Sequence, residues 1–340
     1  MQRRQFLTFG AGTLAASAVA LSGCGTGTGT QPGASSPSRP AAAPRTVTPW
    51  GDADRERALK AITEQFKNDT GVTVNLVVKD NATMTDDFIT QVPTGKGPDA
   101  TITANDGVGK MVQSGVIAPL ELGDTVSSYE PITIKAFTYQ GKIYGVPYAT
   151  ENIALLRNTK LAPTAPKTYD EMVQMGKASG AQYPFLVGLD PQGADPYHLY
   201  PWQMSFGAPV FNQAADGSYD PTKLAMGGAN GDAFAKWLAE QGKASLLNLN
   251  ISQDISKDTF YKGGSPFLVT GPWSLGDIKK NNIPYAIDPI PKAGDKDATP
   301  FVGVQGFVMS SKTTNAVATQ KFLVEYVGQE SVQTALYKAL

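Results

Sequence analysis

The sequence predicts an α/β fold that contains a parallel sheet. Between residues 46 and 104, short apolar runs alternate with stretches of helical periodicity, and this order is typical of βαβ units. The chain has 340 residues, a length that favours two domains. Its apolar content of 41% is sufficient to fill a core.

The first elements follow from spacing. Apolar residues of the helical segments recur every three or four positions, and Gly71 stands where a helix usually ends. We expect, in order, a strand at Thr46–Trp50, a helix at Arg55–Asn68, a strand at Val72–Val78, a helix at Thr83–Val92 and a strand after Asp99. These strands and helices predict a parallel sheet covered on both faces.

A polar turn follows the third strand, at Asn105 and Asp106. Ligands of open α/β sheets bind just past the carboxyl ends of the strands, so both residues are candidates for ligand binding. The alternative is that Asp106 only caps the helix that runs on toward Gly115.

The second half contains shorter elements. We expect 120–137 to be irregular, followed by a hairpin at Tyr139–Tyr144 and an interrupted strand within 145–158. Further strands are expected at Phe185–Leu189, Phe267–Trp273, Ile283–Ile290 and Phe301–Ser310, and helices at Tyr169–Ser179, His198–Phe206, Ala233–Gln241 and Asn315–Leu340, besides one that ends at Tyr261.

Three residues in this half are candidates for a site. Glu151 lies in an apolar strand, where a charge needs a partner unless it faces water. Tyr197 leaves a polar loop and begins a run of aromatic residues that otherwise indicates core. Trp273 follows a Gly-Pro breaker at a strand end, which favours exposure of its ring in a cleft.

Composition excludes several functions. The net charge is −1 without a basic block, which argues against nucleic acid as a partner. One cysteine and one histidine make an internal disulfide impossible and a Cys/His metal site very unlikely, and we expect no metal and no cofactor. Acid–base catalysis by histidine would depend on His198 alone, so the chain is poorly equipped as an enzyme, and we assign no catalytic residue.

The N-terminus is predicted to be an export signal at 1–24. Arg3-Arg4 precede a run of small apolar residues that is too short to span a membrane, and the run ends in Leu21-Ser22-Gly23-Cys24. This end resembles a bacterial lipobox, in which Cys24 is lipidated; an ordinary secretion signal and twin-arginine export remain alternatives. Residues 25–45 lack large apolar side chains and are expected to form a disordered tether.

Several stretches together resemble the extracellular solute-binding proteins of sugar ABC transporters, and most closely the maltose/maltodextrin-binding proteins. They are Phe66-Lys-Asn-Asp-Thr-Gly71, Thr94-Gly-Lys-Gly-Pro-Asp99, Gln113-Ser-Gly115, Tyr139-Gln-Gly-Lys142, Pro166-Lys-Thr168, Thr270-Gly-Pro-Trp273 and Pro300-Phe-Val-Gly-Val304. Each is weak alone, but they occur in the family's order and cover residues 46–340.

The resemblance implies the type II periplasmic-binding-protein fold, with two lobes around a central cleft and several crossovers. Lobe 1 would comprise 46–148 plus 291–340, and lobe 2 would comprise 149–290. The residues implied to contact a sugar, from matching positions, are Asp52, Asp106, Glu151, Asp195, Tyr197 and Trp273.

This chain departs from the family pattern at three places. Thr103 and Gly107 replace a tryptophan and an arginine beside the third-strand acid, and the basic residue expected after Asp52 is absent there, although Arg55 could substitute. The family's final helices would lie beyond Leu340, so we expect a truncated gene product or fragment.

We therefore expect an exported lipoprotein, anchored at the outer face of the cytoplasmic membrane. It would act as a monomer that captures an oligosaccharide and delivers it to ABC permease subunits. The alternatives are an exported glycoside hydrolase that uses Asp106 and Glu151, and a surface adhesin or scaffold without a small ligand.

Overall fold

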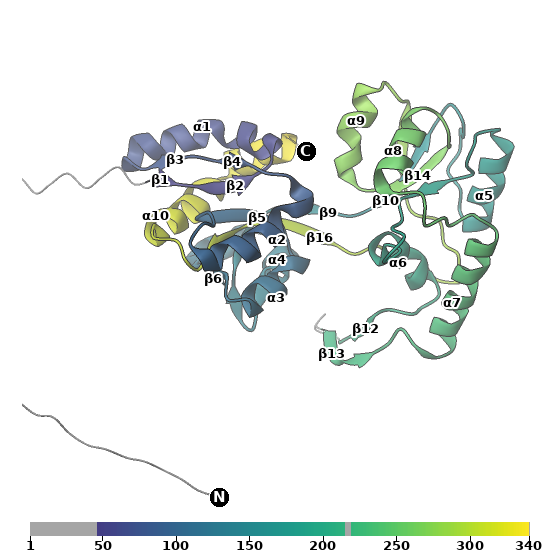
Figure 1. Cartoon of the computed structure of the whole chain (residues 1–340), viewed down its shortest axis with the longest axis horizontal. Coiled ribbons are helices and arrows are strands. Elements are labelled where there is room, and N and C mark those ends of the chain that lie inside the picture. The colour runs from purple at the N-terminus through teal and green to yellow at the C-terminus, as the bar shows by residue number, and fades with distance from the viewer. Residues whose placement is uncertain (1–45, 215–218, 340) are drawn as a thin grey trace, which may run out of the picture. The chain divides into compact units, whose positions relative to one another are not determined.

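The computed structural model describes residues 46–214 and 219–339 (Figure 1). The predicted export signal, the lipidation site Cys24 and the predicted tether lie outside these residues. Helices accompany two separate sheets, each of four or more strands, and this confirms the predicted α/β class.

Segments from both ends of the described chain build the first sheet. Its order is β4–β2–β5–β16–β6, and β9 also pairs with β16. The strands are β2 (Pro49–Gly51), β4 (Val77–Val78), β5 (Ala100–Ala104), β6 (Ile117–Ala118), β9 (Gly145–Glu151) and β16 (Gly303–Ser310). The predicted parallel pairing is confirmed for β2 with β4 and β5, whereas β16 runs antiparallel to β5, β6 and β9. The sheet is therefore mixed.

One continuous core joins this sheet to its helices. The helices are α1 (Ala53–Thr70), α2 (Asn81–Gln91), η1 (Val92–Thr94), α3 (Asp106–Gln113), η2 (Gly123–Ser128), α4 (Pro131–Ala136), α10 (Ala316–Lys321), the π-helical η4 (Phe322–Val327) and α11 (Glu330–Lys338). In the core, Phe66 of α1 lies edge-on to Phe322 and Tyr326 of η4, at centroid distances of 5.2 and 4.8 Å. The purple and yellow ends of the ribbon accordingly lie side by side in Figure 1.

The second sheet has the order β11–β14–β10–β15. Its strands are β10 (Ala154–Asn158), β11 (Leu186–Val187), β14 (Phe267–Thr270) and β15 (Tyr285–Asp288). Alternate residues belong to different cores: Leu155 and Val269 pack in one hydrophobic cluster, and Leu156 and Leu268 pack in another. Both faces of this sheet are therefore covered, as strand periodicity requires.

Helices of the second half cover these faces. They are α5 (Tyr169–Ala178), α6 (Pro196–Ser205), α7 (Gly228–Lys243), α8 (Gln253–Tyr261), η3 (Pro272–Ser274) and α9 (Leu275–Lys280), and a separate hairpin is made by β12 (Phe211–Gln213) and β13 (Tyr219–Leu224). Within the sheet, Arg157 of β10 pairs with Asp288 of β15 at 2.7 Å, and their side chains are only 9% and 12% exposed. Arg157 also donates to two backbone carbonyls, so this charge is well satisfied.

The predicted strand at Val72–Val78 is divided. Its first part is β3 (Thr73–Val74), which pairs with β1 (Thr46–Val47), and its second part is β4, which pairs with β2. The division arises at Thr48, whose backbone N donates to Asp99 Oδ2 at 2.8 Å and so interrupts the first strand. Gly97 permits the turn that brings Asp99 there, since a Cβ at Gly97 would lie 2.8 Å from the backbone of Val92.

Other elements differ from expectation. The segment 120–137 is not irregular but contains η2 and α4, and the expected C-terminal helix is three successive pieces, α10, η4 and α11. The hairpin at Tyr139–Tyr144 is confirmed as β7 (Thr138–Tyr139) and β8 (Lys142–Ile143). The pattern missed α9 and the β12–β13 hairpin, because both are short and largely polar.

Candidate functional site

Asp52 lies where β2 ends and α1 begins. Its backbone is extended and its side chain caps α1, with Oδ1 accepting the backbone N–H of Arg55 at 2.9 Å. Oδ2 accepts from Asn81 Nδ2 at 3.0 Å, and the Arg55 guanidinium pairs with the carboxylate at 3.1 Å. The start of two helices thus holds this acid in one orientation, and it remains 14% exposed.

Arg55 is buried between this acid and an aromatic ring. The guanidinium lies 5.3 Å from the centre of the Tyr148 ring, a cation–π distance. Burial raises the pKa of Tyr148 to about 12, although the charge of Arg55 opposes that change. Arg55 Nε is buried and has no hydrogen-bond partner within the described protein. The sequence suggested that Arg55 could replace the basic residue expected just after Asp52, and its guanidinium does lie beside the Asp52 carboxylate.

Asn105 connects the loop after β5 to β16. Its Oδ1 accepts from the backbone N of Val304 at 2.9 Å, and its own backbone N donates to the carbonyl of Val304 at the same distance. Asp106 begins α3 and is exposed, while the cap position belongs to Asn105, without a side-chain cap bond. The alternative that Asp106 merely caps the helix is therefore wrong.

Glu151 closes β9 and does have a partner. Its Oε1 accepts from Gln305 Nε2 at 2.8 Å, across the β9–β16 pair. The opposite residue is Gly303, where an added Cβ would lie 3.3 Å from Glu151 Cγ. The carboxylate is only partly buried, so one oxygen can be held by Gln305 while the group still meets solvent.

Trp273 lies in the turn after β14, with its side chain 47% exposed. Its ring is folded back over Gly271, where a Cβ would come within 2.2 Å of the indole. Only glycine permits this arrangement. The predicted exposure of the Trp273 ring is confirmed.

The Asp195 carboxylate makes hydrogen bonds at the start of α6, the helix that it caps. Oδ1 accepts the backbone N–H of His198 at 3.1 Å, and Oδ2 meets His198 Nδ1 at 2.8 Å and Gln253 Nε2 at 3.0 Å. Burial raises the pKa of Asp195, but the hydrogen bonds and charge of His198 outweigh it and hold the pKa below its usual range. The backbone φ of 118° is strained for a residue other than glycine, at a cost of about 1–3 kcal/mol.

Tyr197 lies close to acids from three different loops. Burial, together with smaller contributions from the charges of Glu151, Asp106 and Asp195, raises the pKa of Tyr197 to about 12. Such an effect requires these carboxylates to be near the phenol. The grouping of Asp106, Glu151, Asp195 and Tyr197 in one site remains a prediction, which the direction of this pKa shift favours.

A hollow of about 730 Å³ contains the best-formed set of these groups. Among its lining residues are the predicted Asp52, Glu151 and Trp273, whereas the described lining does not include Asn105, Asp106, Asp195 or Tyr197. The polar lining residues not predicted as sites are Asp54, Arg55, Arg57, Asn81, Thr85, Thr103 and Gln305, together with the phenol of Tyr148. Strand alternation could have indicated Gln305, which is two residues from Gly303 on β16.

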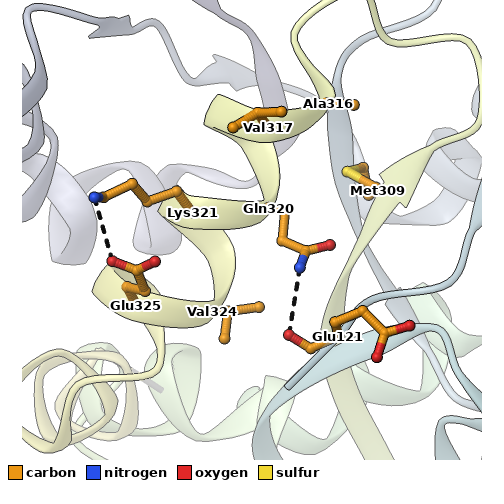
Figure 2. A pocket seen from close by; sticks show the side chains of 8 residues that line it. All are labelled: Glu121, Met309, Ala316, Val317, Gln320, Lys321, Val324 and Glu325. Carbon is orange, nitrogen blue, oxygen red and sulfur yellow. Dashed lines mark hydrogen bonds and ion pairs between the residues drawn. The ribbon is translucent and has the colours of Figure 1, made fainter. Parts of the chain in front are cut away.

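A second hollow, of about 550 Å³, lies beside α10 and is different in chemistry (Figure 2). Its polar groups pair with one another: Lys321 with Glu325 at 3.5 Å, and Gln320 Nε2 with the carbonyl of Glu121 at 3.4 Å. The rest of its lining is aliphatic, without a ring. It therefore lacks polar groups that converge on a ligand.

The described residues offer neither a cluster of metal ligands nor a helix that could span a membrane. Across residues 46–214 and 219–339, no group of three or more His, Asp, Glu or Cys side chains is arranged to hold a metal ion. None of the helices described for this chain has the length and hydropathy needed to cross a bilayer.

Known proteins resemble this chain over most of its length. The galactooligosaccharide-binding protein of Bacillus subtilis (strain 168) is 25% identical over 94% of this chain and 76% of its own. The maltooligosaccharide ABC transporter solute-binding lipoprotein of Streptococcus pneumoniae (strain ATCC BAA-255 / R6) is 24% identical over 96% of this chain and 77% of its own.

A solved structure gives the same result in three dimensions. The Thermus thermophilus maltotriose binding protein bound with maltotriose is 28% identical, with a TM-score of 0.74, over 86% of this chain and 79% of its own. This match confirms the type II periplasmic-binding-protein fold that the resemblance implied. The family described as bacterial extracellular solute-binding protein matches residues 61–340, and the chain belongs to that family.

Proposed function

We propose that this protein is the substrate-binding component of an ABC sugar importer and captures a maltooligosaccharide in the 730 Å³ hollow. The observation that carries the proposal is the presence of two carboxylates, Asp52 and Glu151, and the exposed indole of Trp273 around one hollow. Proteins that bind maltooligosaccharides share the fold and family.

The chemistry suits a neutral sugar. Carboxylates accept hydrogen bonds from hydroxyl groups, and a hydrogen bond to a charged group contributes about 1.5–3 kcal/mol. The indole offers an apolar face to the C–H groups of a sugar ring. Asp106, Asn105, Asp195 and Tyr197 complete the proposed site, with Tyr197 near enough to Glu151 and Asp106 to be affected by their charges.

The two sheets correspond to two lobes in this proposal, at 46–148 plus 291–340 and at 149–290. The hydrophobic clusters agree with this division at Tyr148 and Ile153, but they shift its boundaries: Ala149 packs with the first core, and Ala293 and Ala298 pack with the second. Ligand would bind the closed arrangement better than the open one, because only a difference in affinity can drive closure. The crossovers at 152–153 and 291–302 would act as hinges.

Delivery would occur at a membrane. The family is extracellular, and lipidation of Cys24 would anchor the protein, as a monomer, at the outer face beside the permease subunits. Fractionation of cells that express Cys24→Ala should find the protein released; continued retention in the membrane fraction would contradict the anchor. Co-purification with ABC permease subunits from the same cells would test the partnership.

Calorimetric titration with maltose, maltotriose and a galactooligosaccharide tests the ligand. Maltotriose should bind and should stabilise the fold by about 2.7 kcal/mol at a hundredfold excess over Kd. Binding of the galactooligosaccharide alone would support a sugar-binding function but overturn the assignment of maltooligosaccharide as the ligand. No response to a broad oligosaccharide panel would overturn the proposed function.

We also propose that the protein holds the sugar without cleaving it. Incubation with maltotriose followed by chromatography should return the sugar intact. Release of glucose or maltose that disappears in Glu151→Gln and Asp106→Asn would favour the glycoside hydrolase alternative.

A further inference from the structure

The only histidine of the chain lies between the two aromatic rings of the proposed sugar site. The ring of His198 is edge-on to Tyr197 at 5.4 Å and 79°, and edge-on to Trp273 at 6.0 Å and 79°. His198 itself is only 6% exposed, whereas Trp273 is 47% exposed. One buried ring therefore contacts both the exposed ring of Trp273 and the partly buried ring of Tyr197.

His198 meets two side chains at Nδ1, the carboxylate of Asp195 and, at 3.2 Å, the amide nitrogen of Gln253. Its Nδ1 lies 2.8 Å from Asp195 Oδ2, and a carboxylate oxygen can only accept, so Nδ1 carries the proton. Gln253 Nε2 donates to the same carboxylate oxygen at 3.0 Å and to the carbonyl of Gly188 at 3.1 Å. Gly188 has no room for a side chain, because a Cβ there would lie 2.5 Å from Gln253.

The second ring nitrogen of His198, Nε2, does not hold the imidazole in place. His198 Nε2 is buried and has no hydrogen-bond partner within the described protein. With the proton on Nδ1, Nε2 is the acceptor nitrogen of the ring, and the imidazole is held from its Nδ1 side alone. Rotation of the imidazole would move Nδ1 from Asp195 and leave the acid without this donor.

We propose that His198 is a positioning residue that sets the ring orientations of Tyr197 and Trp273, and that Asp195 and Gln253 fix His198 in turn. This inference rests on the proposed function, since both rings are assigned to the sugar site. It gives Asp195 a positioning role in addition to the sugar contact proposed for it: its two oxygens hold the imidazole and the start of α6. The edge-on geometry is the favourable one for aromatic pairs.

The single histidine makes the first test direct. The purified protein labelled with ¹⁵N-histidine should show one imidazole, in the Nδ1–H tautomer at neutral pH. In Asp195→Asn, the amide group can donate to Nδ1, and the signal should change to the Nε2–H tautomer. An Nε2–H tautomer in the unaltered protein would overturn the proposal without any variant.

The second test measures the rings and the affinity. In His198→Phe the partner of Asp195 is lost, so the ¹⁵N-indole signal of Trp273, assigned with Trp273→Phe, should shift. The Kd for maltotriose should rise about tenfold, because a phenyl ring has no hydrogen bond to Asp195 and no longer holds Tyr197 and Trp273 in their edge-on geometry. Leu247→Ala is the matched control, because Leu247 is buried in the same core cluster as Trp202 but is aliphatic and offers no ring to Tyr197 or Trp273.

The results separate the two proposals. An unchanged Trp273 indole signal and an unchanged Kd in His198→Phe would overturn the positioning role while the sugar function stands. An equal loss of affinity in Leu247→Ala at matched stability would also overturn it, because any damage to this core would then suffice. If the unaltered protein binds no sugar, the proposed function fails, while the tautomer and the indole shift still decide whether His198 sets the rings.

Discussion

The hollow is lined by two groups of side chains that are held in different ways. On the first sheet, Asp52 and Glu151 are held by hydrogen bonds to Arg55, Asn81 and Gln305. Beside the second sheet, Trp273 is held by packing over Gly271 and against His198. The acidic side should therefore tolerate changes that keep a polar group, whereas the aromatic side should be sensitive to shape.

The largest expected effect concerns the sheet beneath the aromatic side. Arg157→Ala would leave Asp288 buried without its partner, and such a change costs about 3–5 kcal/mol of unfolding free energy. Urea denaturation measures this loss. The control is Lys110→Ala, which breaks a pair with Asp86 whose side chains are 63% and 73% exposed and should change stability little. Equal effects in the two variants would contradict the importance of burial.

Trp273→Ala should have the largest effect on binding. Removing a central aromatic contact costs about 2 kcal/mol or more, so the Kd for maltotriose should rise at least about thirtyfold. The unfolding free energy should change much less, because the indole is half exposed. Calorimetry and urea denaturation of the same preparation separate the two effects. A retained affinity would contradict the stacking role.

Gly271→Ala tests shape without removing the ring. The added Cβ would lie 2.2 Å from the indole, so Trp273 must leave its position. We expect greater acrylamide quenching of tryptophan emission and an affinity loss of about tenfold, which is about 1.4 kcal/mol. Gly193→Ala has nothing within 4 Å of the added Cβ and should leave both measurements unchanged.

Glu151→Gln tests the acidic side with the least change in shape. The amide oxygen can still accept from Gln305, but a hydrogen bond from a sugar hydroxyl to a charged acceptor is lost. The affinity should fall about fivefold, or about 1 kcal/mol, less than for Trp273→Ala. A fall larger than that of Trp273→Ala would reverse the comparison between the two sides.

The smallest expected effect is the contribution of Asp195 to the pH dependence of the unfolding free energy. The pKa of Asp195 is lower in the folded protein than in the unfolded chain, so its stabilising contribution is complete above the unfolded pKa of about 4 and is lost as the pH falls through the folded pKa. Urea denaturation between pH 5 and pH 2 should therefore show a shallower decline for Asp195→Asn. Parallel declines would show that Asp195 does not contribute.

Much of the fold was predictable from local patterns. The apolar spacing of α1, with Leu59, Ile62 and Phe66 buried, predicts a helix because one face must pack on a sheet. Parallel pairing of β2 with β5 followed from the βαβ order. The antiparallel return of β16 did not, because its register depends on contacts with residues about 200 positions earlier, such as Asn105 with Val304.

The site divides in the same way. Spacing and resemblance pointed to Asp52, Glu151 and Trp273, which line one hollow, but not to Gln305, whose role depends on its pairing across β9 and β16. They also assigned Asp195 to the sugar. The tertiary structure turns its carboxylate toward His198 and Gln253, because α8 comes from a distant part of the chain and packs beside α6.

The sequence by itself determined most of the longer strands and helices, which strand ends carry acids, and that cysteine and histidine chemistry is nearly absent. These properties depend on residues that are close to one another in the sequence. Only the tertiary structure decided that Asp52, Glu151 and Trp273 share a hollow and that His198 supports two rings. Such contacts join residues far apart in the chain, and side-chain packing, which local periodicity does not encode, selects them.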